Sequence, residues 1–307
     1  MIALLEPLPP ELLVEEPEYG VNLLSAYLQV YRTAEGRALA DRLAPRMSVH
    51  ANDRLHRRFL TMQAMLFNRE GRVAMAEEQL REAEWMATLA GDDYMLAWTT
   101  ERSAIVATIR CDFETALRLH HRALAFSTRG AESHQIGSLH QNLGETYREM
   151  GLYAHARRHH DRALREQLLA PELAIMSFHR ACLHQDLGEL DLAEVFARRA
   201  EEQGRALGSG ALVAGSLRVR GTLAALRGRR DAAMELLRQA LEDARGEEVM
   251  RGTIYEDMAL AHVMFGEPVE ALAAESVAAE IYTRLDAPRR AERMRLRLAV
   301  IALERDA

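Results

Sequence analysis

The sequence predicts an all-α protein built as an array of stacked antiparallel helix pairs. A glycine, an alanine five residues later and a second alanine after seven more recur along the chain. The copies start at Gly71, Cys111, Gly151, Gly188, Gly228 and Gly266, at offsets of 40, 40, 37, 40 and 38 residues. The copy at Cys111 keeps both alanines and lacks the glycine. Hydrophobic residues make up 49% of the chain and aromatic residues only 6%, which is typical of a helical protein.

The residue types of this motif have a structural reason. A glycine between two helices can adopt the left-handed conformation that ends the first helix. The two alanines are seven residues apart, so they lie on one face of the second helix and let neighbouring backbones approach closely. Helices of about 15 residues are about 22 Å long, and one such pair cannot bury a core alone, so at least about three pairs must stack.

Composition excludes several classes of protein. The net charge of −7 argues against a nucleic-acid-binding surface as the main activity, and all 39 basic residues are arginine. The two cysteines, Cys111 and Cys182, lie in different repeats, so we expect neither a disulfide framework nor a cysteine metal site. No apolar run approaches the ~20 residues of a membrane span, and the first ten residues carry prolines instead of a basic leader. We therefore expect a cytoplasmic protein without a membrane partner.

The array divides the chain into three parts. Residues 1–50 form an acidic segment followed by a degenerate capping helix pair, because four prolines prevent one continuous helix over residues 1–18. Residues 51–286 hold six repeats, at about 52–89, 93–128, 132–168, 172–207, 211–245 and 248–285. Residues 287–307 alternate polar and apolar side chains in a way that also fits a strand, but a lone strand has no partner here, so we expect a capping helix.

The third repeat carries a family resemblance. The residues that match are Leu143, Gly144, Tyr147, Gly151, Tyr153, Ala156, Ala163 and Leu164. In this pattern the chain resembles the tetratricopeptide-repeat (TPR) proteins over roughly residues 52–285. The minimal repeat has 34 residues, whereas repeats of 37 to 40 residues resemble the longer subclass of kinesin light chain and of bacterial signal-receptor and transcription-regulator domains. The resemblance implies a right-handed α-solenoid whose concave wall, made by the first helix of each pair, receives a peptide or partner helix.

The resemblance also implies which residues face the partner. They are Arg58, Asn68, Arg69, Glu101, Gln141, Asn142, Glu145, Arg148, Glu149, Phe178, Gln185, Asp186 and Arg218. Asn142 can donate and accept hydrogen bonds to a peptide backbone. The family's carboxylate clamp relies on Lys and Asn; this chain has no lysine and departs from that pattern, and Arg58, Arg69, Arg148 and Arg218 are the residues that could substitute. The alternative is structural: apolar wall residues such as Trp98, Ile105 and Phe178 pack between helices, and charged ones form a solvated face.

Nine of the twelve histidines lie between His120 and His184. His155 and His159 have a spacing that can chelate a metal from one helical face. That face is expected to point outward among several arginines, where a cation is repelled. His120 and His160 occupy equivalent repeat positions and are expected to replace a buried aromatic residue; a pH-sensitive seam is the other alternative. We therefore expect no metal site and no cofactor.

Catalytic motifs are missing from the sequence, which has no GxSxG, no Gly-rich phosphate loop before a Lys and no HExxH. We therefore expect a protein that is not an enzyme: a protein- or peptide-binding scaffold that uses the concave face, including as a signalling receptor. The alternative is a regulatory or oligomerisation module, including a homodimer, that acts with a transcription regulator or kinase on another chain. One further hypothesis is that the acidic residues 1–17 occupy the groove as a built-in competitor, because their glutamates complement arginines of the wall.

Overall fold

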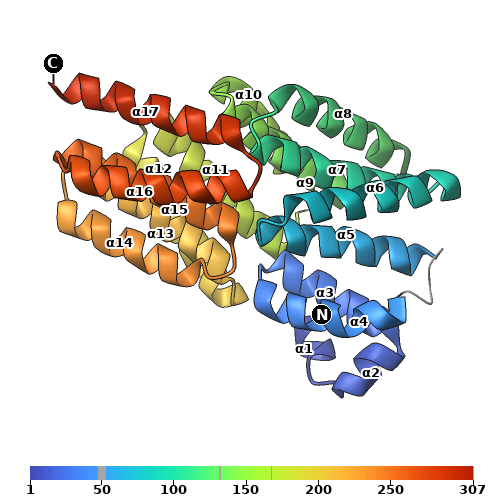
Figure 1. Cartoon of the computed structure of the whole chain (residues 1–307). Helices are drawn as coiled ribbons and strands as arrows, with labels where there is room; N and C mark the ends of the chain where they lie inside the picture. The colour runs from blue at the N-terminus through green and yellow to red at the C-terminus, as the bar shows by residue number, and fades with distance from the viewer. Residues whose placement is uncertain (48–52, 131–132, 167, 307) are drawn as a thin grey trace.

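The computed structural model describes residues 1–47, 53–130, 133–166 and 168–306. Within these ranges the chain forms seventeen α-helices and no strand (Figure 1), which confirms the all-α solenoid. The N-terminal helices are α1 (Ile2–Leu5), α2 (Pro10–Glu15), α3 (Pro17–Gln29) and α4 (Thr33–Met47). The six following pairs are α5 (Arg54–Arg69) and α6 (Val73–Ala90), α7 (Asp93–Ile109) and α8 (Phe113–Gly130), α9 (Ser133–Glu149) and α10 (Tyr153–Ala163), α11 (Ala170–Asp186) and α12 (Leu190–Leu207), α13 (Gly210–Leu226) and α14 (Arg230–Asp243), and α15 (Glu248–Phe265) and α16 (Pro268–Arg284). The last helix is α17 (Pro288–Asp306).

The turns inside the pairs have the predicted conformation. The glycines at 71, 151, 188, 228 and 266 have φ angles between 71° and 78°, in the left-handed region. Cys111 takes the same conformation with φ 57°, although it carries a side chain. Both alanines of every copy are buried against neighbouring helices. The sequence motif therefore reports a real turn geometry, which is kept at Cys111 without glycine.

Helix starts also follow from local chemistry. The Asp92 carboxylate accepts a hydrogen bond from the Met95 amide and so caps α7. Pro171 and Pro268 lie in the first turns of α11 and α16, where a missing amide hydrogen costs nothing. Residues 288–306 form a helix, as expected, and the strand alternative is wrong.

The array bends back until its two ends meet. One hydrophobic core joins residues of α5, α6 and α7, such as Phe67 and Val106, to residues of α15, α16 and α17, such as Tyr282 and Met294. At the same junction Thr33 donates a hydrogen bond to Glu247. Figure 1 shows α17 lying across the molecule toward α7 and α10. The inner faces of the helices therefore surround a central space. None of the helices in the described ranges combines the length and the apolarity needed to cross a lipid bilayer.

A candidate binding cavity on the concave face

The concave side of the solenoid contains a cavity of about 460 Å³. Its wall comes mainly from the first helix of each pair, namely α5, α7, α9, α11, α13 and α15, with the end of α3 closing one side. A volume of this order is typical of a site for a small ligand or a short segment of chain. The structure thus places the first helices on the inner wall, as the resemblance implies.

Eleven of the residues expected to face a partner line this cavity: Arg58, Asn68, Arg69, Glu101, Gln141, Asn142, Glu145, Arg148, Glu149, Phe178 and Arg218. Gln185 and Asp186 are not among its lining residues. Asp186 is connected to the wall, because its carboxylate accepts a hydrogen bond from Arg148. The apolar residues Trp98, Ile105, Ile109 and Phe178 also line the cavity and are only partly buried.

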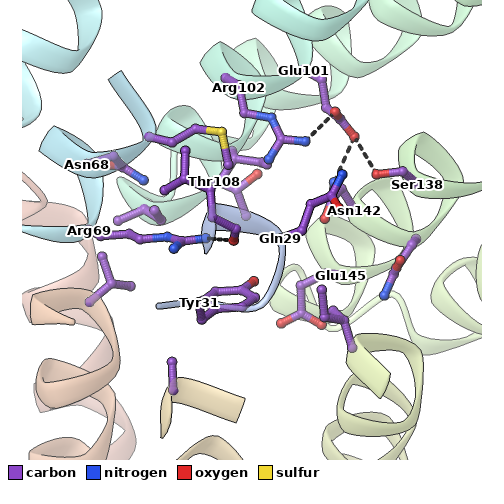
Figure 2. Close-up of a pocket in the computed structure, with 18 of the residues that line it drawn as sticks. Gln29, Tyr31, Asn68, Arg69, Glu101, Arg102, Thr108, Ser138, Asn142 and Glu145 are labelled. Atoms are coloured by element: carbon purple, nitrogen blue, oxygen red, sulfur yellow. Dashed lines mark hydrogen bonds and ion pairs between the residues drawn. The ribbon is translucent and has the colours of Figure 1, made fainter. Parts of the chain in front are cut away.

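Two arginines give one side of the cavity a positive character. Arg58 donates to the Asn22 side-chain oxygen at 2.8 Å. Arg69 donates to the Leu28 carbonyl at 2.8 Å and lies 4.1 Å over the Tyr31 ring (Figure 2). Among the described residues, no carboxylate oxygen lies within 4.0 Å of either guanidinium. Burial lowers the pKa of Arg58, but an arginine remains charged at neutral pH. Both positive charges are therefore available to an anionic group in the cavity.

A buried carboxylate organises the opposite wall. Glu101 is 1% exposed and accepts hydrogen bonds from Asn142 at 2.8 Å and from Ser138 at 3.3 Å. Its second oxygen pairs with Arg102, as Figure 2 shows. The amide nitrogen of Asn142, which the sequence offered to a peptide backbone, is thus used inside the protein. This network holds α7 and α9 at a fixed spacing.

Two other amide side chains of the wall have unused acceptors. The Asn68 Oδ1 and Gln135 Oε1 atoms are buried and have no hydrogen-bond partner among the described residues. Both residues line the cavity. Because a buried acceptor without a partner costs free energy, these two oxygens mark positions where an N–H donor fits.

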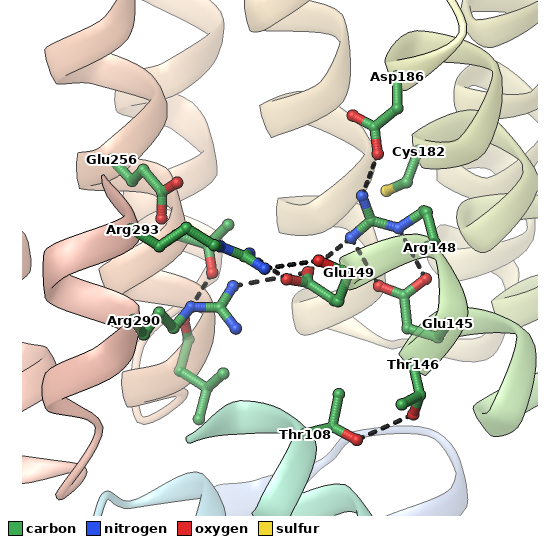
Figure 3. Close-up of polar contacts among 12 residues, drawn as sticks. Thr108, Glu145, Thr146, Arg148, Glu149, Cys182, Asp186, Glu256, Arg290 and Arg293 are labelled. Carbon is green, nitrogen blue, oxygen red and sulfur yellow. Dashed lines mark hydrogen bonds and ion pairs between the residues drawn. The ribbon is translucent and has the colours of Figure 1, made fainter. Parts of the chain in front are cut away.

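An ion cluster closes the cavity on its far side. Arg148 of α9 binds Glu145 at 2.9 and 2.8 Å, Glu149 at 2.7 Å, and Asp186 (Figure 3). Glu149 also pairs with Arg293 and, at 3.7 Å, with Arg290 of α17. Burial alone disfavours the charged carboxylates, but the neighbouring guanidinium groups prevail: they lower the pKa of Glu149, and Arg148 lowers that of Glu145 to about 2.

Several wall residues were missed by sequence reasoning. Tyr31 and Gln29 come from the N-terminal pair, and Arg290 comes from α17. Tyr31 has φ 57° and lies 40 residues before Gly71, at the turn position of the repeat. This offset was a usable signal for a further, degenerate copy of the motif. Nothing in the repeat pattern, by contrast, indicates that Arg290 folds back over α9.

The hypothesis that residues 1–17 occupy the groove is wrong. The lining of the cavity begins at Ser25 and includes none of these residues. Instead α1 and α2 pack against α3 and α4, and Glu6 binds Arg32 at 2.9 Å and accepts from Tyr27 at 3.1 Å. The acidic segment therefore finds its basic partner within the N-terminal pair, outside the cavity.

Comparisons with known proteins agree with this architecture. Residues 95–165 match the tetratricopeptide repeat family. The fold is similar to the crystal structure of a Rap protein complexed with competence and sporulation factor, at 13% identity and a TM-score of 0.61, covering 95% of this chain and 99% of that one. It is also similar to the apo form of the quorum sensor NprR from B. thuringiensis, at 14% identity and a TM-score of 0.52, covering 92% and 86%. No functionally curated protein matches the sequence significantly. The chain therefore contains tetratricopeptide repeats over residues 95–165, and these lie within one solenoid of six helix pairs that turn at glycine or cysteine.

Proposed function

We propose that this protein is a receptor scaffold that binds a short peptide in the concave cavity. The proposal rests on two kinds of group on the cavity wall whose binding capacity the protein itself does not use. Arg58 and Arg69 have no carboxylate within salt-bridge distance in the described part of the chain, and Asn68 and Gln135 have unpaired amide oxygens. Cationic groups beside hydrogen-bond acceptors match a peptide, which offers carboxylates and backbone N–H groups.

The same chemistry narrows the class of peptide. A carboxylate of the ligand, from an acidic side chain or a free C-terminus, binds beside Arg58 and Arg69 through charge-assisted hydrogen bonds. Apolar side chains of the ligand lie against Trp98, Ile105 and Phe178, which line the cavity and are only partly buried. A volume of about 460 Å³ suits a few residues of chain and not a folded domain.

The similar structures support a role in signalling by binding. One is a Rap protein in complex with a factor named for competence and sporulation, and the other is a quorum sensor. We infer by analogy of fold that this chain also works by binding a signal and not by catalysis. Its ligand then changes the activity of a protein partner through the shape of the solenoid.

Selection from a random peptide library tests the proposal. Full-length protein is used to select short displayed peptides, and the affinity of the best sequences is measured by titration calorimetry with wild type and with Arg58→Ala. We expect enrichment of peptides that carry a carboxylate, and weaker binding to the variant. Arg158→Ala, which removes an exposed arginine of α10 and leaves the cavity intact, is the matched control. Equal affinity for all three proteins contradicts binding in the cavity.

A second candidate function is self-association through the last helices. Leu296, Val300 and Leu303 are exposed on one face of α17, four and three residues apart. Val269 and Leu272 of α16, the helix that packs against α17, are exposed too. Exposed apolar patches of this kind occur at protein interfaces. Size-exclusion chromatography with light scattering distinguishes this function from the peptide receptor. A wild-type dimer that dissociates in Leu296→Glu supports an oligomerisation module. A monomeric wild type contradicts it.

A further inference from the structure

Three consecutive helices bring potential metal ligands together at the edge of the cavity. They are Glu145 on α9, His160 on α10 and His179 on α11. One ligand atom of each lies within 4.8 Å of those of the other two. The two imidazole rings are roughly parallel, with centroids 6.0 Å apart and planes at 16°. This cluster differs from the His155 and His159 pair that the sequence pattern had singled out.

The two histidines have hydrogen-bonding groups that the protein does not use. His160 is 2% exposed, and neither of its ring nitrogens has a partner among the described residues. His179 is 8% exposed, and its Nδ1 is unpaired in the same way. Buried polar atoms are nearly always satisfied, because leaving one unpaired costs about 1–3 kcal/mol. The unpaired nitrogens on these two adjacent buried rings are therefore available to coordinate an ion.

Packing alone does not require histidine at this position. Leu80 and Leu237 lie nine residues after Gly71 and Gly228, as His160 lies nine after Gly151. The leucine at 237 packs beneath Gly221 as His160 packs beneath Gly144. His120, at the same repeat position, differs from His160 because its Nε2 is 3.0 Å from the Thr146 hydroxyl. A hydrocarbon thus fills the space equally well, and the imidazole of His160 needs another explanation.

We propose that Glu145, His160 and His179 bind one Zn²⁺ ion. Two imidazoles and one carboxylate with a water molecule form a known zinc coordination set. Zinc bonds of about 2.0–2.1 Å place tetrahedral ligand atoms roughly 3.4 Å apart, so each side chain moves inward by about 1 Å on binding. Burial lowers the pKa of His179 and lowers that of His160 to about 3, so both rings are neutral at pH 7 and offer a lone pair.

The charges around the cluster permit a cation. Arg148 holds both oxygens of Glu145, but each carboxylate oxygen has a second lone pair, and ligating carboxylates are commonly held by an outer hydrogen bond. Arg148 also contacts Glu149 and Asp186. Since Glu149 is matched by arginines of α17, Glu145 and Asp186 share one guanidinium and keep a net negative charge. The more distant Arg180 opposes a cation only weakly, through its charge.

The position of the site gives the ion a structural role. Glu145 and His179 line the cavity, so an ion reaches the site from the concave side. Once bound, it links α9, α10 and α11 at the middle of the solenoid, next to the ion cluster of Glu149. The ion therefore stabilises one relative arrangement of two adjacent repeats.

Calorimetry and thermal unfolding of the full chain test the proposal. Protein freed of metal with a chelator is titrated with Zn²⁺, and we expect one ion per chain and a higher melting temperature. His160→Leu should remain folded, because leucine occupies the equivalent position in two other repeats, and should bind zinc at least 10-fold more weakly. His120→Leu is the matched control and should bind zinc like the wild type. Glu145→Gln, nearly equal in shape, is the second variant if His160→Leu unfolds.

Two results would overturn the proposal. One is equal zinc affinity in wild type and in the ligand variants. The other is loss of binding in His159→Gln alone, because the Nδ1 atoms of His140 and His159 lie 3.1 Å apart and offer a competing surface site. Loss of the zinc-dependent rise in melting temperature in both His160→Leu and Glu145→Gln, with the rise kept in His120→Leu and His159→Gln, supports it.

Discussion

Arg293 of α17 donates hydrogen bonds to both the backbone carbonyl of Glu149, at 2.6 Å, and the carboxylate of the same residue on α9. The two residues are 144 positions apart in the sequence. Arg290 approaches the same carboxylate at 3.7 Å and also lines the cavity (Figure 3). The contact therefore connects the end of the solenoid to its middle and covers one side of the candidate site.

Removing the charge of Glu149 should loosen this connection. In Glu149→Gln three arginines, Arg148, Arg290 and Arg293, lose a shared partner in a mostly buried place, and breaking a buried ion pair costs about 3–5 kcal/mol. We expect a large drop in the free energy of unfolding from urea denaturation and a larger radius of gyration from X-ray scattering.

The matched control for this experiment is Glu275→Gln. It breaks the exposed pair of Glu275 with Arg295, also on α17, at 3.1 Å, and an exposed pair contributes about 0–1 kcal/mol. A Glu149→Gln protein that is as stable and as small as the control would show that the closure does not depend on this contact.

Arg58 should determine the preference of the cavity for carboxylates. Its side chain contacts Asn22 at 2.8 Å, so its removal leaves no carboxylate of the described chain unpaired. One charge-assisted hydrogen bond contributes about 1.5–3 kcal/mol, so Arg58→Ala should lower the affinity for an acidic peptide about 10- to 100-fold. Replacing the ligand carboxylate with an amide should weaken wild-type binding by a similar factor, and should change binding to the variant little. If the losses in affinity from Arg58→Ala and from the ligand amide simply add, the ligand carboxylate does not bind at Arg58.

Replacing Gly144 or Gly151 with alanine should destabilise the protein, for a different reason at each position. A Cβ at Gly144 lies 2.4 Å from the His160 ring, so overpacking costs about 1–3 kcal/mol. A Cβ at Gly151 meets no atom within 4 Å, but the φ angle of 77° costs an alanine about 1–2 kcal/mol. In a His160→Ala background the cost of Gly144→Ala should disappear and that of Gly151→Ala should remain. Equal costs of Gly144→Ala in both backgrounds would contradict a steric origin.

The repeat pattern predicted those parts of the fold that depend on local chemistry. Glycine turns, the Asp92 cap and the prolines at helix starts all follow from backbone properties of single residues. Tyr31 and Cys111 adopt the same left-handed turn without glycine, and there the 40-residue offset was more informative than the residue type. The repeat spacing therefore locates the turns even where the residue at the turn is not glycine.

The remainder of the candidate site depends on contacts that no period encodes. Glu149 was expected on the concave wall, but its pairing with α17 depends on the total curvature of six helix pairs. A small change in the angle between successive pairs accumulates over the array, and the sequence of one pair does not define it. For the same reason the cluster of Glu145, His160 and His179, which spans three helices, was not visible as a spacing.

Buried histidines should make the stability of the protein depend on pH. Burial lowers the pKa of His120 to about 3 and that of His160 to about 3, from the usual 6.5. The unfolded chain therefore binds more protons than the folded chain below pH 6.5, and stability falls as the pH falls toward 3. Between pH 6.5 and 5.5 the unfolded imidazole goes from half to mostly protonated, so each such histidine costs about 1 kcal/mol of stability and the pair about 2 kcal/mol.

The acidic residues with shifted pKa values either lose their contribution below this pH range or oppose the loss of stability. Glu145 has its pKa lowered to about 2, so its contribution is fully present above about pH 4.5 and is lost only below that value. Glu247, whose pKa burial raises, binds a proton more readily when folded and so offsets part of the loss. Burial also lowers the pKa of His140, His159 and His179, so these rings add to the decline between pH 6.5 and 5.5, and His120 and His160 supply only part of it.

Urea denaturation in the presence of a chelator, at pH 7.5, 6.5 and 5.5, measures this dependence. The double variant His120→Leu, His160→Leu should be stable, because Leu80 and Leu237 occupy the equivalent position, and its free energy of unfolding should change less between pH 6.5 and 5.5. His155→Gln, which changes an exposed histidine of α10, should keep the dependence of the wild type. If the double variant loses as much stability as the wild type over this interval, the pH dependence arises from groups other than these two buried rings.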